Sequence, residues 1–449
     1  MKKYFLAIAS FFIYSHISLG QVYPGQMDST FVPVRSHHYD PELTFDFCVN
    51  EPAWSNQAGI HSAFGSTDRL YFRKEVPVNH DNDLSSSYST TVWRGERANA
   101  QILVWSSEAL EQVRVSTQDL RSAEGNIIPK DRITFELVRY VLSNYPYAEK
   151  KAICGESPYK SGFLMPDRFE TLDRFDLPSQ TTRPVWMMVD VPRGTVPGTY
   201  KGQVEVRAKG KAPQLLNLEI VVQNQLLPYP KDWKYRLDLW QNPWAVAWYN
   251  HVEPWSPEHK MLLKQHLKHY ADAGGTYITT YGVHSPWSDN SYMIEGGMIE
   301  WIKKADGTWA FDYKIFDEYV ELAMECGIDE EITLYTPIPW GFRHRYKDEA
   351  TGDYSYINWA PSSEEFKKMW NIFLTDFKFH LEAKSWLDIA YIGINENPME
   401  ETLAAINVVR NHDKCWKITY AGNWHKELDG LLDDYSFLYG EEPTIAEQK

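Results

Sequence analysis

Hydrophobic and polar residues alternate with a period of two between residues 91 and 225. Five runs show the alternation most clearly: residues 100–105, 132–140, 184–192, 199–206 and 215–223. This period is typical of half-buried β-strands, and many short strands without helical periodicity between them predict a β-sandwich. Because Pro197 and Gly198 separate the third run from the fourth, these two runs are predicted to form a β-hairpin.

After the proline-containing segment 226–230, predicted strands alternate with amphipathic helices. The predicted strands are residues 235–240, 276–281, 331–336, 387–394 and 416–421, with a sixth near 435–438. The predicted helices are residues 257–273, 313–325, 362–383 and 399–411. Alternation at this spacing indicates a parallel sheet. Long aromatic loops follow the strands and short ones precede them, which favours a (β/α)₈ barrel of the TIM type with its site at the carboxyl ends of the strands.

The two patterns predict two domains, a β-sandwich over residues 21–230 and a barrel over residues 231–449. About five to six barrel strands are found where a closed barrel has eight, so the barrel is predicted to be incomplete at its C-terminus. Residues 1–20 belong to neither domain. Lys2 and Lys3 precede an apolar run and small residues end at Gly20, which predicts a cleaved secretory signal peptide and a secreted or periplasmic protein.

Composition narrows the classes of partner. The chain has 45 Lys and Arg against 61 Asp and Glu, a net charge of −16, which argues against binding to a nucleic-acid backbone. No segment after the signal peptide is apolar enough to span a membrane. Aromatic residues make up 15% of the chain, and they suit either a large aromatic core or stacking on sugar rings. The four cysteines, Cys48, Cys154, Cys326 and Cys415, are too far apart in sequence to suggest a metal site, and no disulfide can be assigned.

Polar and aromatic residues recur in the loops after five successive predicted strands. The candidate sugar contacts, chosen by their position at strand ends, are Trp240, His284, Tyr335, Trp340, Asn423 and Tyr435. Any one of these residues taken alone is explained by loop packing, helix capping or surface exposure. Their recurrence favours a shared site, because the carboxyl ends of parallel strands converge on one mouth.

Glu396 follows the fourth of these strands and is the candidate general acid. In an aromatic-lined mouth its carboxyl is expected to be partly desolvated, which favours the protonated form that glycosidic cleavage requires. The alternative is that Glu396 caps the helix that follows it. The chain has no zinc-protease, serine-hydrolase, P-loop or dinucleotide motif in a suitable context, so neither a metal nor a cofactor is expected.

Several longer strings point to a family. They are WRGER at 93–97, LDLWQ at 237–241, VEPWS at 252–256, WIKKADG at 301–307 and FDY at 311–313. With them the chain resembles the β-N-acetylgalactosaminidases of glycoside hydrolase family 123 and the related domain of unknown function 4091. The resemblance extends from the predicted sandwich to Tyr435. It implies an N-terminal β-sandwich followed by a (β/α)₈ barrel.

The resemblance also implies an activity, the exo-acting, retaining removal of terminal β-linked N-acetylgalactosamine from a glycan or glycolipid. In this family the 2-acetamido oxygen of the substrate attacks the anomeric carbon, and an adjacent Asp-Glu pair assists. Glu396 matches the acid/base, whereas Asn395 stands where the family has Asp. An Asn can accept a hydrogen bond from the acetamido N–H but offers no negative charge to the developing cation. The expected cost in rate is about 10²–10³-fold.

Two alternatives stay open. Asn followed by Glu at the end of a fourth barrel strand also resembles the acid/base motif of retaining glycosidases that act on 2-hydroxy sugars. Their nucleophile is a second Glu on the seventh strand, which would lie beyond Lys449. The other alternative is a sugar-binding protein without catalytic activity, which Asn395 and the incomplete barrel would both favour.

Overall fold

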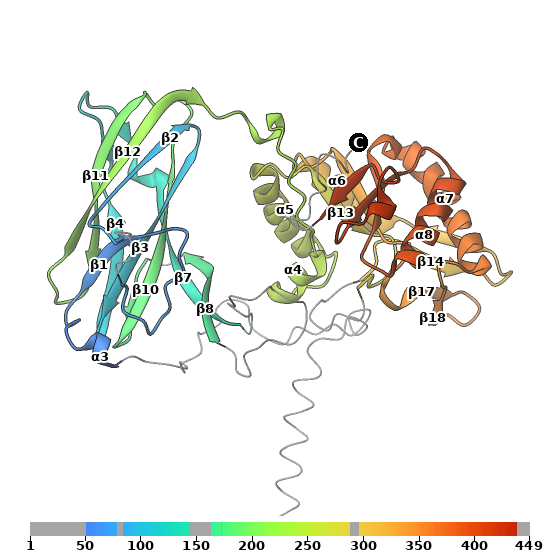
Figure 1. The fold of residues 1–449 in the computed structure, drawn as a ribbon, viewed down its shortest axis with the longest axis horizontal. Helices are drawn as coiled ribbons and strands as arrows, with labels where there is room; N and C mark the ends of the chain where they lie inside the picture. Colours follow the sequence, from blue (N-terminus) through green and yellow to red (C-terminus); the bar gives the residue numbers. More distant parts are fainter. Residues whose placement is uncertain (1–50, 79–83, 144–162, 172, 288–295, 438–449) are drawn as a thin grey trace, which may run out of the picture. The chain divides into compact units, whose positions relative to one another are not determined.

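The computed structural model describes residues 51–78, 84–143, 163–171, 173–287 and 296–437 (Figure 1). The predicted signal peptide, Cys48 and Cys154 lie outside these residues. The described chain divides into two compact units, one ending at Pro228 and the other beginning at Tyr229.

The unit that ends at Pro228 begins with a short helix, α3 (Glu51–Trp54), and consists mainly of two β-sheets. The first sheet has the order β1-β3-β10-β7-β8, and all its neighbouring strands are antiparallel. Its strands are β1 (His61–Gly65), β3 (Arg97–Ser106), β7 (Ile133–Ser143), β8 (Phe163–Thr171) and β10 (Thr181–Asp190). The second sheet has the order β2-β12-β11-β4-β9, with β5 and β6 attached to it. Its strands are β2 (Ser87–Arg94), β4 (Leu110–Thr117), β5 (Leu120–Arg121), β6 (Ile127–Ile128), β9 (Phe175–Leu177), β11 (Gly198–Arg207) and β12 (Gln214–Leu226).

Side chains from both sheets form a single apolar core, the arrangement of a β-sandwich. On β12 the buried residues are Leu216, Leu218, Ile220 and Val222, so burial follows the period of two seen in the sequence. The mostly-β character predicted for the N-terminal part of the chain is therefore confirmed.

The predicted hairpin between residues 184–192 and 199–206 is wrong. Strand β10 pairs with β3 and β7 in the first sheet, whereas β11 pairs with β12 and β4 in the second. The segment around Pro197 and Gly198 therefore passes from one sheet to the other. Two alternating strands with a turn signal between them have the same sequence pattern whether they pair with each other in one sheet or lie in the two sheets on opposite sides of the core.

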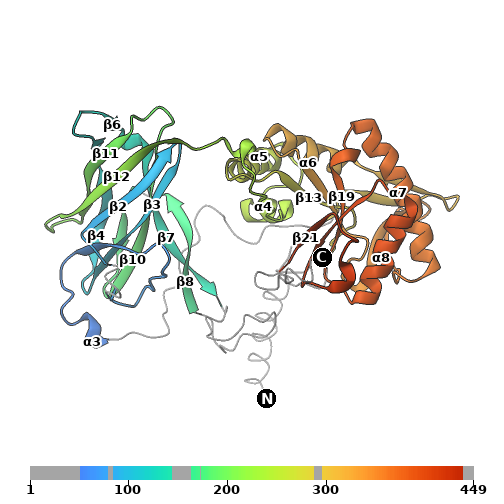
Figure 2. The same ribbon diagram turned by 45° about the horizontal axis from the view of Figure 1, so that its top comes forward.

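The unit that begins at Tyr229 is built on a parallel sheet whose strands follow the order of the chain, β13-β16-β19-β20-β21. These strands are β13 (Tyr277–Tyr281), β16 (Glu331–Tyr335), β19 (Ala390–Ile394), β20 (Lys417–Ala421) and β21 (Asp434–Ser436). Figure 2 labels β13, β19 and β21 of this sheet. Every residue of β13 and β16 is buried, as expected where both faces of a parallel sheet are covered.

Four longer helices belong to this unit and begin and end within two residues of the predicted positions. They are α5 (Pro257–Asp272), α6 (Lys314–Glu325), α7 (Glu364–Lys384) and α8 (Met399–His412). The side chains of Ser256 and Ser363 accept hydrogen bonds from the first turns of α5 and α7 and so fix where these helices begin. On α7 the buried aromatic residues recur at helical spacing, so part of the aromatic excess belongs to the core.

The predicted barrel is not confirmed. Within the residues that the structure describes, the five parallel strands form an open sheet and not a closed barrel. The strand predicted at 235–240 is also wrong, because Leu237 makes only an isolated parallel bridge to Gly275. After this bridge, β13 is contacted by a side chain where a neighbouring strand would have offered its backbone. The Oε1 of Gln241 accepts a hydrogen bond from the backbone N–H of Thr279 at 2.8 Å.

Loops of this unit carry further structure that the sequence pattern did not predict. A four-stranded sheet of order β15-β14-β17-β18 is formed from the loops after β13 and β16. Its strands are β14 (Glu300–Lys303), β15 (Trp309–Asp312), β17 (Arg343–Asp348) and β18 (Tyr354–Asn358). Helix α4 (Pro243–Asn250) precedes α5 and is capped by Asn242. Over the described residues, every helix is too short or too polar to cross a membrane.

Candidate active site

Asn395 and Glu396 directly follow β19, at the carboxyl edge of the parallel sheet. The register aligns Gly393 of β19 with Tyr335 of β16, and Ile394 with Tyr420 of β20. The segments that follow β16, β19 and β20 therefore lie side by side. Among the described residues, this edge brings together the two predicted catalytic residues and the predicted contacts Tyr335, Asn423 and Tyr435.

Asn395 is buried, with 2% of its surface exposed, and belongs to a small polar network. Its Oδ1 accepts hydrogen bonds from Thr336 Oγ1 at 3.3 Å and from Asn397 Nδ2 at 3.0 Å. Its Nδ2 is buried and has no hydrogen-bond partner among the described residues. The sequence analysis did not select Thr336 or Asn397 as site residues. The signal that could have found Asn397 is its position two residues after Asn395, just past the end of β19.

Glu396 is exposed in the described structure, so the expected desolvation of its carboxyl is not found. Its Oε1 accepts a hydrogen bond from the backbone N–H of Asn423 at 3.0 Å. The helix-capping alternative is wrong, because the N-cap of α8 is Pro398 and no side chain caps this helix. The carboxyl is thus tied to the loop after β20 and remains accessible to a ligand.

Gly422 makes this approach of Glu396 to the β20 loop feasible. A Cβ atom at this position would lie 2.5 Å from Glu396 Cγ and 2.6 Å from Tyr420 Oη, well inside van der Waals contact. The pKa of Tyr420 is raised to about 12, first by burial and then by the charge of Glu396. The Tyr420 hydroxyl therefore stays protonated beside the carboxylate at neutral pH.

Tyr435 and Asn423 have structural contacts at the same edge. The Tyr435 hydroxyl donates to the backbone carbonyl of Asn423 at 2.8 Å and accepts from the backbone N–H of His425 at 2.7 Å. Tyr435 thus fixes the loop whose backbone holds Glu396. The side chain of Asn423 is exposed next to that backbone.

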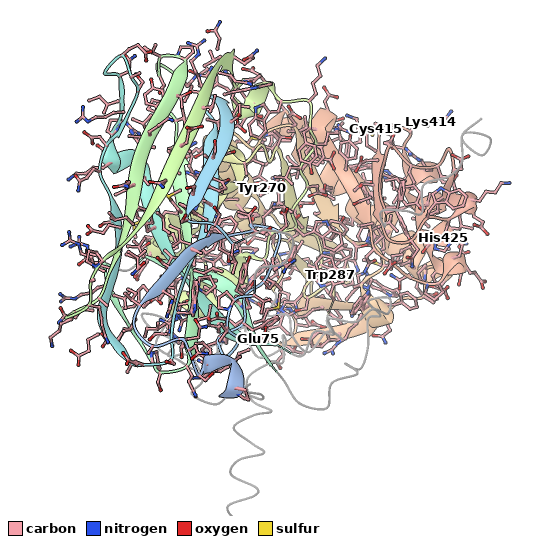
Figure 3. All side chains as sticks on the ribbon, turned by 60° about the vertical axis from the view of Figure 1, so that its left-hand side comes forward. Glu75, Tyr270, Trp287, Lys414, Cys415 and His425 are labelled. Atoms are coloured by element: carbon pink, nitrogen blue, oxygen red, sulfur yellow. The ribbon has the colours of Figure 1, made fainter. Side chains whose placement is uncertain are left out.

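An aromatic cluster covers the ends of β13 and β16. Trp240 stacks on Trp287, with ring centroids 5.2 Å apart, and also contacts the ring of Tyr335 at 4.8 Å. Trp287, labelled in Figure 3, and Tyr335 are buried, whereas Trp240 remains 43% exposed. Burial raises the pKa of Tyr335 well above its usual value, so its hydroxyl is neutral. Trp240 therefore offers an aromatic surface to solvent on a rigid base.

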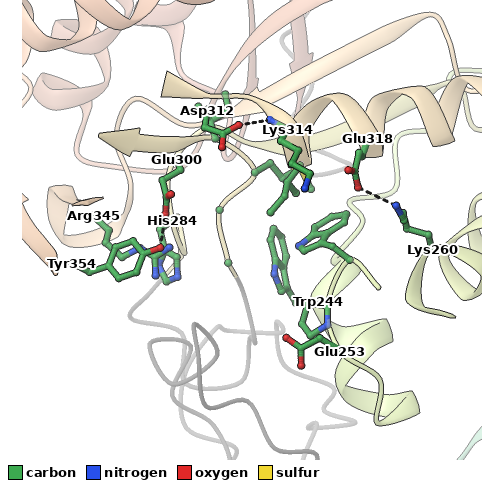
Figure 4. A pocket seen from close by; sticks show the side chains of 17 residues that line it. Trp244, Glu253, Lys260, His284, Glu300, Asp312, Lys314, Glu318, Arg345 and Tyr354 are labelled. Carbon is green, nitrogen blue, oxygen red and sulfur yellow. Dashed lines mark hydrogen bonds and ion pairs between the residues drawn. The ribbon is translucent and has the colours of Figure 1, made fainter. Parts of the chain in front are cut away.

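His284 and Trp340 are placed differently from the other predicted contacts. His284 lines a cavity of about 480 Å³ together with Trp244, Trp255 and several charged residues (Figure 4). Neither Glu396 nor any other predicted contact lines this cavity. Trp340 is partly buried against the core, and its backbone N–H donates to the carbonyl of Pro286 at 2.8 Å. The structure thus gives Trp340 a packing role and does not join His284 to Glu396.

Other carboxyl groups lie at the opposite, amino edge of the parallel sheet. Glu331 and Asp434 are the first residues of β16 and β21, and Asp238 follows the bridge between Leu237 and Gly275. Burial raises the pKa of Glu331 to about 7, and burial followed by the charge of Asp434 raises that of Asp238 to about 6. Arg236 partly compensates these charges, with its Nη1 3.8 Å from Asp434 Oδ1.

No group of three or more His, Cys, Asp or Glu side chains in the described part of the chain is arranged to hold a metal ion. Cys326 and Cys415 are both free thiols. The chemistry that the edge can offer is thus that of one accessible carboxyl, one buried amide and an aromatic surface. This combination suits the binding and cleavage of a sugar.

Two family models match the chain. The glycoside hydrolase 123 catalytic domain matches residues 240–449, and the glycoside hydrolase 123 N-terminal domain matches residues 64–208. The chain is therefore a glycoside hydrolase. It belongs to glycoside hydrolase family 123, as the sequence strings indicated.

A solved structure agrees with this assignment. The chain is similar to a family 123 glycoside hydrolase from Clostridium perfringens, solved to show the details of glycolipid glycan hydrolysis, with 25% identity and a TM-score of 0.73. The match covers 85% of this chain and 67% of the other. A family 39 glycoside hydrolase from Bacteroides cellulosilyticus matches at 13% identity, covering 69% of this chain and 48% of the other, with a TM-score of only 0.24. No curated protein matches the chain significantly.

Proposed function

We propose that the protein is an exo-acting, retaining glycosidase that removes terminal β-linked N-acetylgalactosamine, with the sugar's own acetamido group as nucleophile. The observation that carries the proposal is the accessible carboxyl of Glu396 beside Asn395 at the carboxyl edge of the sheet, inside the region that matches the catalytic domain. The Clostridium perfringens enzyme acts on glycolipid glycans, which supports a glycan of this class as the substrate here.

In the first step, protonated Glu396 donates its proton to the glycosidic oxygen as the bond to the anomeric carbon breaks. The carbonyl oxygen of the 2-acetamido group attacks the anomeric carbon from the opposite face. The leaving alcohol departs with the proton from Glu396, and the sugar becomes an oxazolinium ion. The Asn423 backbone N–H, which binds Glu396 Oε1, then stabilises the resulting carboxylate.

In the second step, the Glu396 carboxylate takes a proton from a water molecule, whose oxygen attacks the anomeric carbon. The oxazolinium ring opens and the acetamido group is regenerated. Two displacements at one carbon retain the β configuration. Trp240 provides the surface on which the apolar face of the sugar ring stacks, because its indole is exposed and is held by Trp287 and Tyr335.

Asn395 is the residue that contacts the 2-acetamido group in this proposal. An amide places no negative charge beside the positive oxazolinium ion. We therefore expect this enzyme to be slower than one with a carboxylate at the same position, by about 10²–10³-fold.

The place of action belongs to the same proposal. The basic and apolar character of residues 2–17, followed by small residues up to Gly20, supports export through a cleaved signal peptide. An exported enzyme meets extracellular glycans directly.

The direct test is hydrolysis of an aryl β-N-acetylgalactosaminide, followed by release of the aryl alcohol. Glu396→Gln should lower kcat/KM by about 10²–10⁴-fold, because an amide cannot donate the proton. Glu400→Gln, at an exposed Glu in the first turn of α8, is the matched control and should leave the rate unchanged. Undiminished hydrolysis by the Glu396 variant would remove Glu396 from the mechanism.

Asn395→Asp in the same assay tests the role of the acetamido group. The variant should be faster than the natural chain by about 10² or more if the substrate's own amide is the nucleophile. Equal rates in two samples with the same circular dichroism spectrum would contradict substrate assistance.

A further inference from the structure

The backbone carbonyl of Ile338 determines how the side chain of Asn397 is oriented. Asn397 Nδ2 lies 3.0 Å from this oxygen, which can only accept a hydrogen bond. The reverse orientation would place two acceptor oxygens against each other. The atom of Asn397 at this point is therefore the nitrogen.

The same nitrogen then determines the orientation of Asn395. Asn397 Nδ2 is 3.0 Å from the side chain of Asn395, and a donor requires an acceptor opposite it, so the facing atom is Asn395 Oδ1. Thr336 Oγ1 donates to the same oxygen at 3.3 Å. Both hydrogen bonds fall on Oδ1, and the buried Nδ2 is left as a donor without a partner among the described residues.

From this chain of contacts we infer that Asn395 is a fixed hydrogen-bond donor to the C2 substituent of the bound sugar, and that Asn397 is the positioning residue that fixes it. The inference rests on the proposed function and names the class of ligand, sugars whose C2 group carries an acceptor oxygen. An acetamido or a hydroxyl group meets this requirement, whereas a protonated amine or a bare C2 methylene does not.

This inference revises the expectation that Asn395 accepts a hydrogen bond from the acetamido N–H. Its only side-chain oxygen already serves two donors, so the amide contacts the acetamido carbonyl oxygen instead. That contact positions the oxygen for attack on the anomeric carbon but draws electron density from it. The acetamido N–H, which becomes more acidic in the oxazolinium ion, receives no acceptor from Asn395.

An Asp at position 395 would reverse this polarity without moving a backbone atom. One carboxylate oxygen would accept from Thr336 and Asn397, as Oδ1 now does. The other would replace the unpartnered Nδ2 and present an acceptor. Replacement of the Asn395 nitrogen by oxygen would therefore change a site that selects hydrogen-bond acceptors at C2 into one that selects donors.

The test measures the dissociation constants of four free sugars by ligand-observed NMR at about pH 5.5, where an amino sugar is protonated. The sugars are N-acetylgalactosamine, galactose, 2-deoxygalactose and galactosamine, which differ only at C2. The natural chain should bind N-acetylgalactosamine and galactose at least about tenfold more tightly than 2-deoxygalactose and galactosamine. The last two sugars offer no acceptor at C2 and leave Asn395 Nδ2 buried without a hydrogen bond. Asn395→Asp should reverse the order of galactose and galactosamine.

Two variants examine Asn397. Asn397→Leu removes the donor that orients Asn395, so the amide can turn and the preference at C2 should fall to about twofold or less. Asn397→Asp replaces the donor that faces Asn395 with an acceptor. The Asn395 amide should then turn its Nδ2 toward residue 397 and its Oδ1 toward the sugar, which should shift the preference toward galactosamine. Asn371→Leu, at an exposed position on α7, is the control and should keep the natural preference.

The ratio between sugars is the decisive readout, since a merely structural role of Asn397 would weaken all four sugars together. Unchanged ratios in both Asn397 variants would overturn the inference. Binding by the natural chain without discrimination at C2 would overturn it as well while leaving the proposed function intact. Failure of the natural chain to bind any of the four sugars would overturn the proposed function itself.

Discussion

The two edges of the parallel sheet carry carboxyl groups in opposite environments. At the amino edge, Glu331 is buried and Asp238 is partly buried, and their pKa values are raised to about 7 and about 6. At the carboxyl edge, Glu396 is exposed and bound by a backbone N–H. A search guided by raised pKa values alone would select the amino edge. The carboxyl edge is the candidate site instead because Glu396 follows the end of β19 and lies inside the region that matches the catalytic domain.

The difference follows from where each carboxyl group is attached. Glu331 begins β16 and lies within the packed sheet, so its charge loses contact with water. Among the described residues its carboxyl accepts one side-chain hydrogen bond, from Thr333 Oγ1 to Oε1 at 2.8 Å, and Oε2 has no partner. Glu396 lies past the end of β19, where the chain has left the sheet. Burial raises the pKa of a carboxyl group whether its role is structural or catalytic. A catalytic carboxyl group must in addition be accessible to a ligand.

The largest expected effect comes from displacing the accessible carboxyl. Gly422→Ala puts a Cβ 2.5 Å from Glu396 Cγ, so the Glu396 side chain must move. We expect kcat/KM on an aryl β-N-acetylgalactosaminide to fall by about 10²-fold or more, since small displacements of a catalytic group have costs of this size. Gly194→Ala, where the added Cβ meets nothing within 4 Å, is the control. Full activity of the Gly422 variant would show that catalysis does not depend on the present position of Glu396.

A smaller effect is expected at the amino edge, and on stability rather than on rate. The pKa of Glu331 is raised from 4.5 to about 7. Below the lower value both folded and unfolded chains are protonated, so the group has no effect. As pH rises toward 7 the unfolded chain ionises first, and the fold is progressively destabilised.

Glu331→Gln removes this titration. The loss of unfolding free energy between about pH 5 and about pH 8 should shrink by about 2 kcal/mol in the variant, as measured by urea denaturation. Glu330→Gln, at the exposed neighbouring position, should leave the pH dependence as it is. An identical pH dependence in the Glu331 variant and the natural chain would mean that Glu331 titrates normally in the fold.

The smallest effect concerns the loop that holds Glu396. Tyr435→Phe removes the hydroxyl that bonds the backbone at Asn423 and His425, and should cost about 1 kcal/mol of stability with a several-fold loss of kcat/KM. Tyr356→Phe, at an exposed tyrosine on β18, serves as the comparison. If both variants retain natural activity, the Tyr435 hydroxyl does not position the loop for catalysis.

The sequence predicted helices α5 to α8 closely, because their apolar residues recur at helical spacing. Serine caps mark the starts of α5 and α7, and glycines follow α5 and α6. It failed where one pattern fits two arrangements. The residues of β10 and β11 alternate as a hairpin would, yet the strands belong to different sheets. Residues 235–240 have strand-like composition, but the Gln241 side chain, not the backbone, bonds to β13.

The candidate site was predictable to the level of strand ends and no further. Asn395, Glu396 and Asn423 lie at one edge because parallel strands share their direction. The environment of Glu396 was not predictable, because exposure depends on how neighbouring loops fold. His284 illustrates the same limit, since the loop after β13 directs it to a cavity without Glu396. The contacts of Asn397 with Ile338 and Asn395 depend on side-chain geometry that spacing does not encode.

The stacking of Trp240 on Trp287 has an optical consequence. Two indoles 5.2 Å apart and nearly parallel couple their electronic transitions, which gives the pair a circular dichroism signal distinct from those of isolated tryptophans. Within this pair only Trp240 is exposed, so soluble quenchers reach its indole and not that of Trp287. The difference between the spectra of the natural chain and of Trp240→Phe therefore isolates the signal of this pair from those of the other tryptophans.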